Sequence, residues 1–364
     1  MNFDKNFFEQ IKKIEDYFVK KDIEKSQIMN TLCKEVFNID PSFFDTISSP
    51  PEHNYAKFEE KFSVSNFVEN FVKDYSILAS DGSRITIEER LPFPFYVINV
   101  ASVFEKIGKS PVHEVKNKAE IFFNENDIYD LNGELLSEQD INLKMLLKEA
   151  EFLSENISKY NPDITLFDGS LILWGLKRTQ KINAQTAIKI FESPITTSVN
   201  LKKPIAGYIS GTRSKEVIKS LILYLKGKGI SLDYRLLLNL NDSDLINYIL
   251  KKNQRTSVFS STEKLLSYYM NKIYFYFIKT EYEVIRVEIP DFVYENKNLF
   301  DKLNKILFTE INRGKGYPLI LKLAHFEAVI GDQEKQFIEN SIRSKLGEFT
   351  NYSEKFFSKI SRKI

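Results

Sequence analysis

A short pattern, an apolar segment that runs into Asp-Gly-Ser, occurs twice in this chain, at residues 81–83 and again at residues 168–170. Each apolar segment is typical of a buried strand, and the glycine lets backbone approach a ligand closely. In open α/β sheets, ligands bind beyond the carboxyl ends of the strands. The repeated pattern therefore predicts an α/β fold in which Asp81 and Asp168 lie where neighbouring strands end at one edge of the sheet.

The hydrophobic spacing of the remaining chain adds strands and helices to this sheet. An amphipathic helix is predicted at 142–160 and further helices from residue 297 onward. The other predicted strands are at 91–104, 119–123, 274–278 and 284–289, the last two as a hairpin. Together these elements predict a mixed sheet flanked by helices.

The chain is expected to divide into three parts. Residues 1–70 are predicted to form an N-terminal helical segment, residues 71–350 the main domain with a mostly helical insertion at 215–270, and residues 351–364 a basic tail. Apolar residues recur at helical spacing in the first part, and their shared face is expected to pack on the body of the protein. These residues are Phe3, Phe7, Ile11, Ile14 and Phe18.

Charge and cysteine usage narrow the class of protein. The chain has 51 Lys and Arg against 50 Asp and Glu, a formal net charge of +1, which excludes binding to nucleic acid by an overall basic chain but not by a local groove. The single cysteine cannot form an internal disulfide. The longest uncharged stretch, 91–104, contains two prolines and is shorter than the ~20 apolar residues of a membrane span. We therefore expect a soluble cytoplasmic protein without a membrane partner.

Two aspartates on neighbouring strands repel each other unless a cation lies between them or one is protonated. Carboxylate oxygens are hard ligands, so the expected cation is Mn²⁺ or Mg²⁺ rather than zinc. The helix at 142–160 offers a third carboxylate, because Glu149 and Glu151 lie on opposite flanks of its apolar stripe. Helical spacing alone does not choose between these two, and a solvated flank is the default for each.

A later segment, Gly316-Tyr317-Pro318 through His325, adds polar groups to an apolar region. Pro318 suits the first position of a helix, so Tyr317 is expected just before it. The helix is apolar almost all round, which predicts that it is buried together with His325. A buried imidazole is either a satisfied core residue or, near clustered carboxylates, a metal ligand or proton-transfer group.

The chain resembles the NurA nuclease family from about Asp74 to Gly347. The resemblance rests on five segments in the family's order, with a weaker sixth from Asp244 to Thr256. The five are Asp81-Gly-Ser-Arg84, the helix with Glu151, Leu166-Phe-Asp168-Gly-Ser-Leu171, Pro204-Ile-Ala-Gly-Tyr208, and Tyr317-Pro through Ala324-His325. The family's spacing to Asp168 favours Glu151 over Glu149.

This resemblance implies a ribonuclease H-like fold, related to the Piwi nuclease domain, and a Mn²⁺-dependent (or Mg²⁺-dependent) DNA nuclease. It implies 5′-3′ exonuclease or single-strand endonuclease activity, or both, in DNA end processing, by a homodimer that works with a HerA-type hexameric ATPase. The motor would be another chain, because Gly108-Lys109-Ser110 lacks the earlier glycine of a P-loop. The alternatives are a catalytically weak adaptor that binds DNA and the ATPase, a HerA–NurA antiviral defence nuclease, and a phosphohydrolase of small substrates.

The resemblance also assigns roles to residues. Asp81, Glu151 and Asp168 are expected to hold the metal, His325 to complete its shell or move a proton, and Tyr317 to position a phosphate or water. Residues near these motifs are expected along the DNA path through phosphate contacts or stacking. They are Arg84, Lys177, Arg178, Lys203, Tyr208, Arg213 and Arg255.

Overall fold

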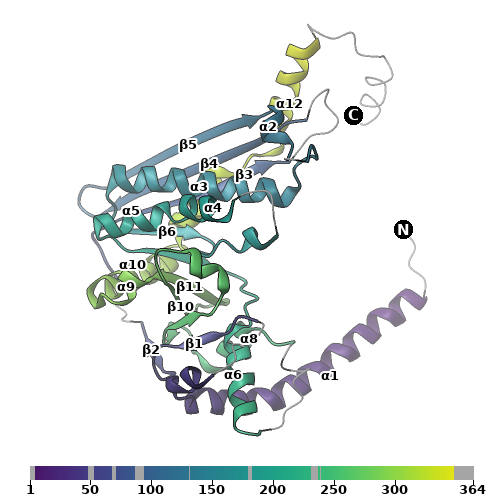
Figure 1. Ribbon diagram of the computed structural model, residues 1–364, viewed down its shortest axis with the longest axis vertical. Helices are drawn as coiled ribbons and strands as arrows, with labels where there is room; N and C mark the ends of the chain where they lie inside the picture. Colours follow the sequence, from purple (N-terminus) through teal and green to yellow (C-terminus); the bar gives the residue numbers. More distant parts are fainter. Residues whose placement is uncertain are drawn as a thin grey trace.

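A computed structural model describes residues 5–47, 53–67, 71–86, 94–130, 132–178, 183–230, 237 and 239–347. In these residues one eleven-stranded mixed sheet runs through the molecule with helices on both of its faces (Figure 1). Its strand order is β1-β9-β10-β11-β7-β6-β3-β4-β5, with β8 and β2 paired beside β10. The sheet therefore joins segments from almost the whole length of the chain.

One half of the sheet carries both Asp-Gly-Ser motifs. The antiparallel strands β3 (Tyr75–Ile85), β4 (Tyr96–Ile107) and β5 (Val112–Phe122) form a meander. Two parallel strands, β6 (Ile164–Asp168) and β7 (Ile205–Ile209), continue the sheet on the other side of β3. This order, β5-β4-β3-β6-β7, confirms the predicted ribonuclease H-like mixed sheet flanked by helices.

The other half of the sheet contains more strands than predicted. The predicted hairpin is present as β10 (Ile273–Lys279) and β11 (Val284–Pro290), and β11 pairs with β7. Four strands of three residues each were not predicted, because they are too short to show a period of two. They lie in the predicted helical segment before residue 70 and in the predicted mostly helical insertion at 215–270. These strands are β1 (Ala56–Phe58), β2 (Val64–Asn66), β8 (Gln254–Thr256) and β9 (Phe259–Ser261).

Helices cover the two faces of the sheet separately. Successive residues of a strand face opposite sides of the sheet. Leu78 of β3 packs with α3 (Glu138–Tyr160) on one face. Its neighbours Ile77 and Ala79 pack on the other face with α10 (Lys297–Arg313) and α11 (Leu319–Ala328). The remaining longer helices are α4 (Ala184–Phe191), α5 (Ser193–Leu201), α6 (Glu216–Gly227), α8 (Asp242–Ile249) and α12 (Asp332–Gly347). The short helical segments are η1 (Val36–Asn38), η2 (Pro41–Thr46), α2 (Glu125–Ile128), η3 (Trp174–Arg178), η4 (Lys264–Tyr268) and α9 (Asp291–Tyr294).

Among its described side chains, the N-terminal helix α1 (Lys5–Glu35) packs on the protein through its last turns. Met29 and Leu32 are buried in a core that includes α6 and α8, but the earlier turns project away from the sheet (Figure 1). Phe7 and Phe18 are 40% and 64% exposed, so the expectation that this face packs on the body is wrong. Phe3 and residues 351–364 lie outside the described residues.

No helix among the described residues combines the length and the apolar composition that a membrane crossing requires.

Candidate active site

Asp81 and Asp168 lie side by side in the sheet. The parallel pairing of β3 with β6 matches Ser80 to Phe167, so the next residue on each strand, Asp81 or Asp168, stands at the same level. Adjacent strands are ~4.8 Å apart, which brings these two carboxylates together as predicted. One detail differs from the prediction: β3 does not end at Asp81 but continues to Ile85, because β4 pairs with it along that length.

A third carboxylate, that of Glu149 on α3, reaches the same place from the other face of the sheet. Glu149 is 1% exposed, and its Oε1 atom is buried without a hydrogen-bond partner among the described residues. It lies next to Gly82, where a β-carbon would come within 3.4 Å of Glu149 Oε2. Burial, and then the charges of Asp81 and Asp168, raise the pKa of Glu149 well above its ordinary value.

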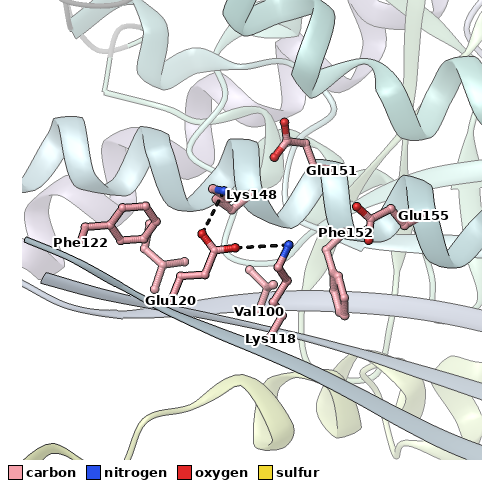
Figure 2. Close-up of a pocket in the computed structure, with 9 residues that line it drawn as sticks. Val100, Lys118, Glu120, Phe122, Lys148, Glu151, Phe152 and Glu155 are labelled. Carbon is pink, nitrogen blue, oxygen red and sulfur yellow. Dashed lines mark ion pairs between the residues drawn. The ribbon is translucent and has the colours of Figure 1, made fainter. Parts of the chain in front are cut away.

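Glu151, the helix carboxylate expected in the site, lies elsewhere. It is exposed and lines a small recess of about 20 Å³ with Phe152, Glu155 and the Lys118–Glu120–Lys148 ion-pair cluster (Figure 2). Two residues along a helix differ by about 200° in direction, so Glu149 and Glu151 cannot both face the sheet. The structure therefore corrects the prediction: the carboxylate beside Asp81 and Asp168 is Glu149.

Tyr317 and His325 each contact one aspartate. The Tyr317 hydroxyl donates to Asp168 Oδ1 over 2.8 Å, and His325 Nδ1 lies 2.7 Å from Asp81 Oδ2, within hydrogen-bond distance. Burial and the neighbouring Asp168 raise the pKa of Tyr317, so the hydroxyl keeps its proton. The His325 side chain is 60% exposed. The expectation of a buried histidine is wrong, because only part of the apolar helix α11 faces the sheet.

The three carboxylates offer the hard oxygen ligands that a divalent cation prefers. Burial raises the pKa of Asp168, and the nearby Asp81 adds to that shift, while the Tyr317 hydroxyl and His325 oppose it. A cation among three carboxylates would relieve this repulsion. Across the described part of the chain, however, no three carboxylate, imidazole or thiol groups stand ready to hold a metal ion. Asp81 and Asp168 are hydrogen-bonded on the α11 side, whereas Glu149 approaches from the α3 side.

Two of the basic residues expected along the DNA path lie at this edge of the sheet. Arg84, on β3 just past Asp81, donates from Nη1 to Asn142 over 2.9 Å. Arg213 follows the carboxyl end of β7 and is exposed. Lys203 lies instead before β7, at the opposite end of the parallel strands, with its Nζ 3.6 Å from Asp163.

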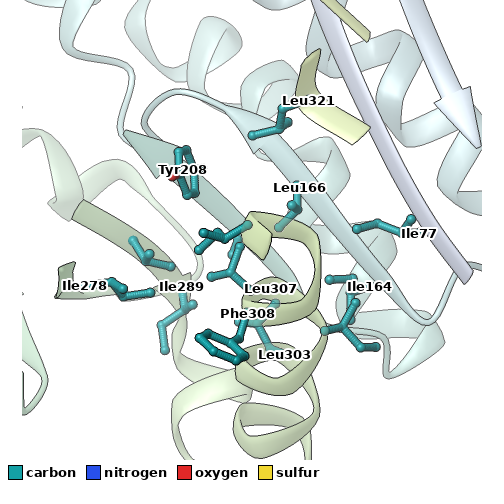
Figure 3. Close-up of a cluster of buried hydrophobic side chains, with 14 of the residues drawn as sticks. Ile77, Ile164, Leu166, Tyr208, Ile278, Ile289, Leu303, Leu307, Phe308 and Leu321 are labelled. Carbon is teal, nitrogen blue, oxygen red and sulfur yellow. The ribbon is translucent and has the colours of Figure 1, made fainter. Parts of the chain in front are cut away.

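Other expected DNA contacts have structural roles or cannot be placed. Tyr208 is fully buried in the core shown in Figure 3, and its ring meets the ring of Tyr317 edge-on, so it cannot stack on a base. Arg255 lies on β8 over the ring of Phe300. The side chains of Lys177 and Arg178 lie outside the described residues.

One buried charged pair near the motifs was not predicted from the sequence. Arg286 and Glu288 lie on β11, are almost completely buried, and contact each other over 2.9 Å. The signal was present in the sequence, because Val284–Pro290 is otherwise apolar and yet carries two charges two residues apart. On a strand, that spacing places both charges on one face.

Comparison with known proteins gives a match over most of the chain. A family model described as the NurA domain matches residues 75–330, a range that contains Asp81, Glu149, Asp168, Tyr317 and His325. No curated protein matches the chain. Among solved structures, prototype foamy virus protease-reverse transcriptase is similar at 12% identity and a TM-score of 0.20, over 39% of this chain and 18% of that chain.

Proposed function

The chain belongs to the NurA family of nucleases, and from that premise we propose that it is a metal-dependent deoxyribonuclease. The observation that supports this most is the placement of one buried carboxylate near two others. Asp81 and Asp168 stand level on adjacent parallel strands, and their charges, after burial, raise the pKa of the Glu149 carboxylate. A carboxylate buried without a hydrogen-bond partner is costly to the fold, and a cation-binding role accounts for it.

In this proposal Asp81, Glu149 and Asp168 would hold Mn²⁺ or Mg²⁺. The bound ion would lower the pKa of a water and neutralise charge on the scissile phosphate. Tyr317 directs the Asp168 carboxylate through its hydroxyl. His325 is exposed and in contact with Asp81, and we assign it the role of proton transfer in this proposal.

A second candidate function is an adaptor that binds DNA and an ATPase without cutting. It is favoured by one observation, that no set of groups in the described chain is already arranged to hold a metal. Mn²⁺ should raise the melting temperature of the nuclease because it binds only the folded state. An adaptor with an idle site would show no such shift.

The test of the proposed function is cleavage of end-labelled single-stranded and double-stranded DNA. With Mn²⁺ we expect shortened products, and with a chelator we expect none. A generic phosphomonoester should stay intact under the same conditions, and its hydrolysis in place of DNA would favour a phosphohydrolase. Intact DNA at every Mn²⁺ and Mg²⁺ concentration would contradict the proposal.

We also propose that the chain works as a homodimer with a HerA-type hexameric ATPase, in DNA end resection or antiviral defence. The near-neutral net charge of +1 supports loading by a partner, since it gives weak attraction to the DNA backbone. Adding the ATPase should increase the length of DNA degraded per binding event. Equal digestion with and without it would contradict this part of the proposal.

The salt dependence of DNA binding should separate Arg213 from Lys203. Arg213→Ala removes an exposed cation at the carboxyl edge of β7, whereas Lys203→Ala removes one that pairs with Asp163 at the opposite edge. Each phosphate contact contributes a slope of about 0.7–0.9 to the plot of log K against log salt concentration. We expect Arg213→Ala to lower the slope by about that amount and Lys203→Ala to leave it unchanged. Equal slopes for the two variants would exclude the proposed path past Arg213.

A further inference from the structure

A buried carboxylate on β11 holds the turn that follows Asp168. Glu288 is fully buried, and its Oε2 accepts hydrogen bonds from the Ser170 hydroxyl at 2.7 Å and from the Leu171 amide at 2.8 Å. The Ser170 hydroxyl oxygen in turn accepts from the indole of Trp174 at 3.0 Å. The turn after the site aspartate is thus tied to a residue more than a hundred positions away in the sequence.

The contact depends on a glycine in the strand between. Glu288 pairs with Gly207 of β7, and Gly207 pairs with Phe167 of β6, so the three residues form a row across the sheet. A β-carbon at Gly207 would come within 2.6 Å of the carbonyl oxygen of Gly169. Because Gly207 has no side chain, the turn can lie over β7 and reach Glu288.

The orientation of Glu288 is itself held by Arg286. Arg286 Nε donates to Glu288 Oε1 over 2.9 Å, while Nη1 of the same guanidinium contacts Ser214 and Glu216. The guanidinium also lies 3.6 Å from the centre of the Phe275 ring. Glu288 therefore receives donors on both oxygens, a pattern that a carboxylate satisfies and a carboxamide, with one donating nitrogen, does not.

We propose that Glu288 is a positioning residue for Asp168: it holds the turn at residues 169–171 over Gly207 and thereby fixes Asp168 beside Asp81. The effect on DNA cleavage rests on the proposed function. The effect on the turn rests on the contacts alone, so the two can be tested apart. Residues that orient metal-binding groups through hydrogen bonds typically contribute about 10–100-fold in metal affinity or activity.

The test compares Glu288→Gln with Asp140→Asn. Asp140 is a matched control because it is also buried and accepts from one serine hydroxyl and one backbone amide, both of Ser137, at the start of α3. Trp174 is the only tryptophan in the chain, so its fluorescence reports on the turn without requiring activity. Cleavage kinetics and the Mn²⁺ concentration that gives half of the thermal stabilisation complete the measurements.

For Glu288→Gln we expect shifted Trp174 emission with stronger quenching by acrylamide. We also expect an Mn²⁺ midpoint raised about tenfold, and kcat lowered about tenfold with KM for DNA within about twofold. Asp140→Asn should lower the melting temperature but keep wild-type emission, Mn²⁺ midpoint and kcat. If Glu288→Gln does not fold, Ser170→Ala, which removes one contact of the turn, should show the same changes to a smaller degree.

Three results would overturn the proposal. The first is wild-type Trp174 emission in both Glu288→Gln and Ser170→Ala. The second is altered emission in Glu288→Gln with unchanged kcat and Mn²⁺ midpoint. The third is a loss of kcat and Mn²⁺ affinity in the Asp140→Asn control equal to that in Glu288→Gln. If the wild-type protein does not cleave DNA, the proposed function fails. The emission of Trp174 then still decides whether Glu288 holds the turn.

Discussion

Replacing Glu149 with Gln is expected to lower Mn²⁺-dependent DNA cleavage by about a thousandfold or more, while Glu151→Gln stays within about twofold of wild type. The two glutamates are two residues apart on α3, but of the two only Glu149 is buried and has its pKa raised by the charges of Asp81 and Asp168. Metal-assisted charge stabilisation is worth several kcal/mol, and about 1.4 kcal/mol corresponds to tenfold in rate. Single-turnover cleavage of end-labelled DNA at saturating Mn²⁺ measures the effect on the chemical step.

Each variant is the matched control for the other, since both replace one carboxylate by one amide on the same helix. Circular dichroism should show the same helix content for both. Loss of cleavage in Glu151→Gln with full activity in Glu149→Gln would contradict the geometry and restore the assignment that the family's spacing favours. Equal loss in both would indicate that the helix as a whole, rather than one side chain, matters for cleavage.

The two aspartates were predictable from the sequence for a simple physical reason. β3 and β6 are parallel neighbours, so a motif repeated at the same level of the two strands brings Asp81 beside Asp168. The pairing of Tyr317 with Asp168 and of His325 with Asp81 was not derivable from spacing. Only the resemblance placed those two side chains near the carboxylates.

Other features depend on packing that a local pattern does not encode. The choice between Glu149 and Glu151 requires the rotation of α3 about its axis, which is set by its contacts with β3 and β4. Tyr208 is buried in a core cluster together with residues of α10 and α11. The apolar face of α1 was predicted to be buried but is exposed. Amphipathic spacing shows that a face is apolar, but it does not show what covers that face.

Contacts between strands that are distant in the sequence were the hardest to predict. Glu288 reaches Ser170 only because β7 lies between β11 and β6 and carries Gly207 at the crossing point. Neither the Asp-Gly-Ser motif nor the charged pair on β11 indicates that arrangement by itself. Lys203 is similar: its proximity to the motifs in the sequence suggested a DNA contact, but its partner is Asp163 at the far edge.

The metal-free protein should lose stability as the pH rises, and Glu149→Gln should remove part of that loss. The pKa of Glu149 in the folded protein is raised above the ordinary value of 4.5 by burial and by Asp81 and Asp168. The folded state therefore holds this proton more tightly than the unfolded chain does. The contribution of this proton to the free energy of unfolding is complete below about pH 4.5. It is lost as the pH rises through the folded-state pKa, at up to about 1.4 kcal/mol per pH unit.

Urea unfolding in a chelator at pH values from 5 to 9 measures this difference. We expect Glu149→Gln to be more stable than wild type at the upper end of the range and to approach wild type at the lower end, because Gln does not ionise. Adding Mn²⁺ should reverse the order at high pH, since only wild type gains binding free energy, about 2.7 kcal/mol at a hundredfold excess over Kd. A Glu149→Gln protein that is less stable than wild type at every pH, with and without Mn²⁺, would show that Glu149 stabilises the fold as a carboxylate and that its burial serves packing rather than a cation.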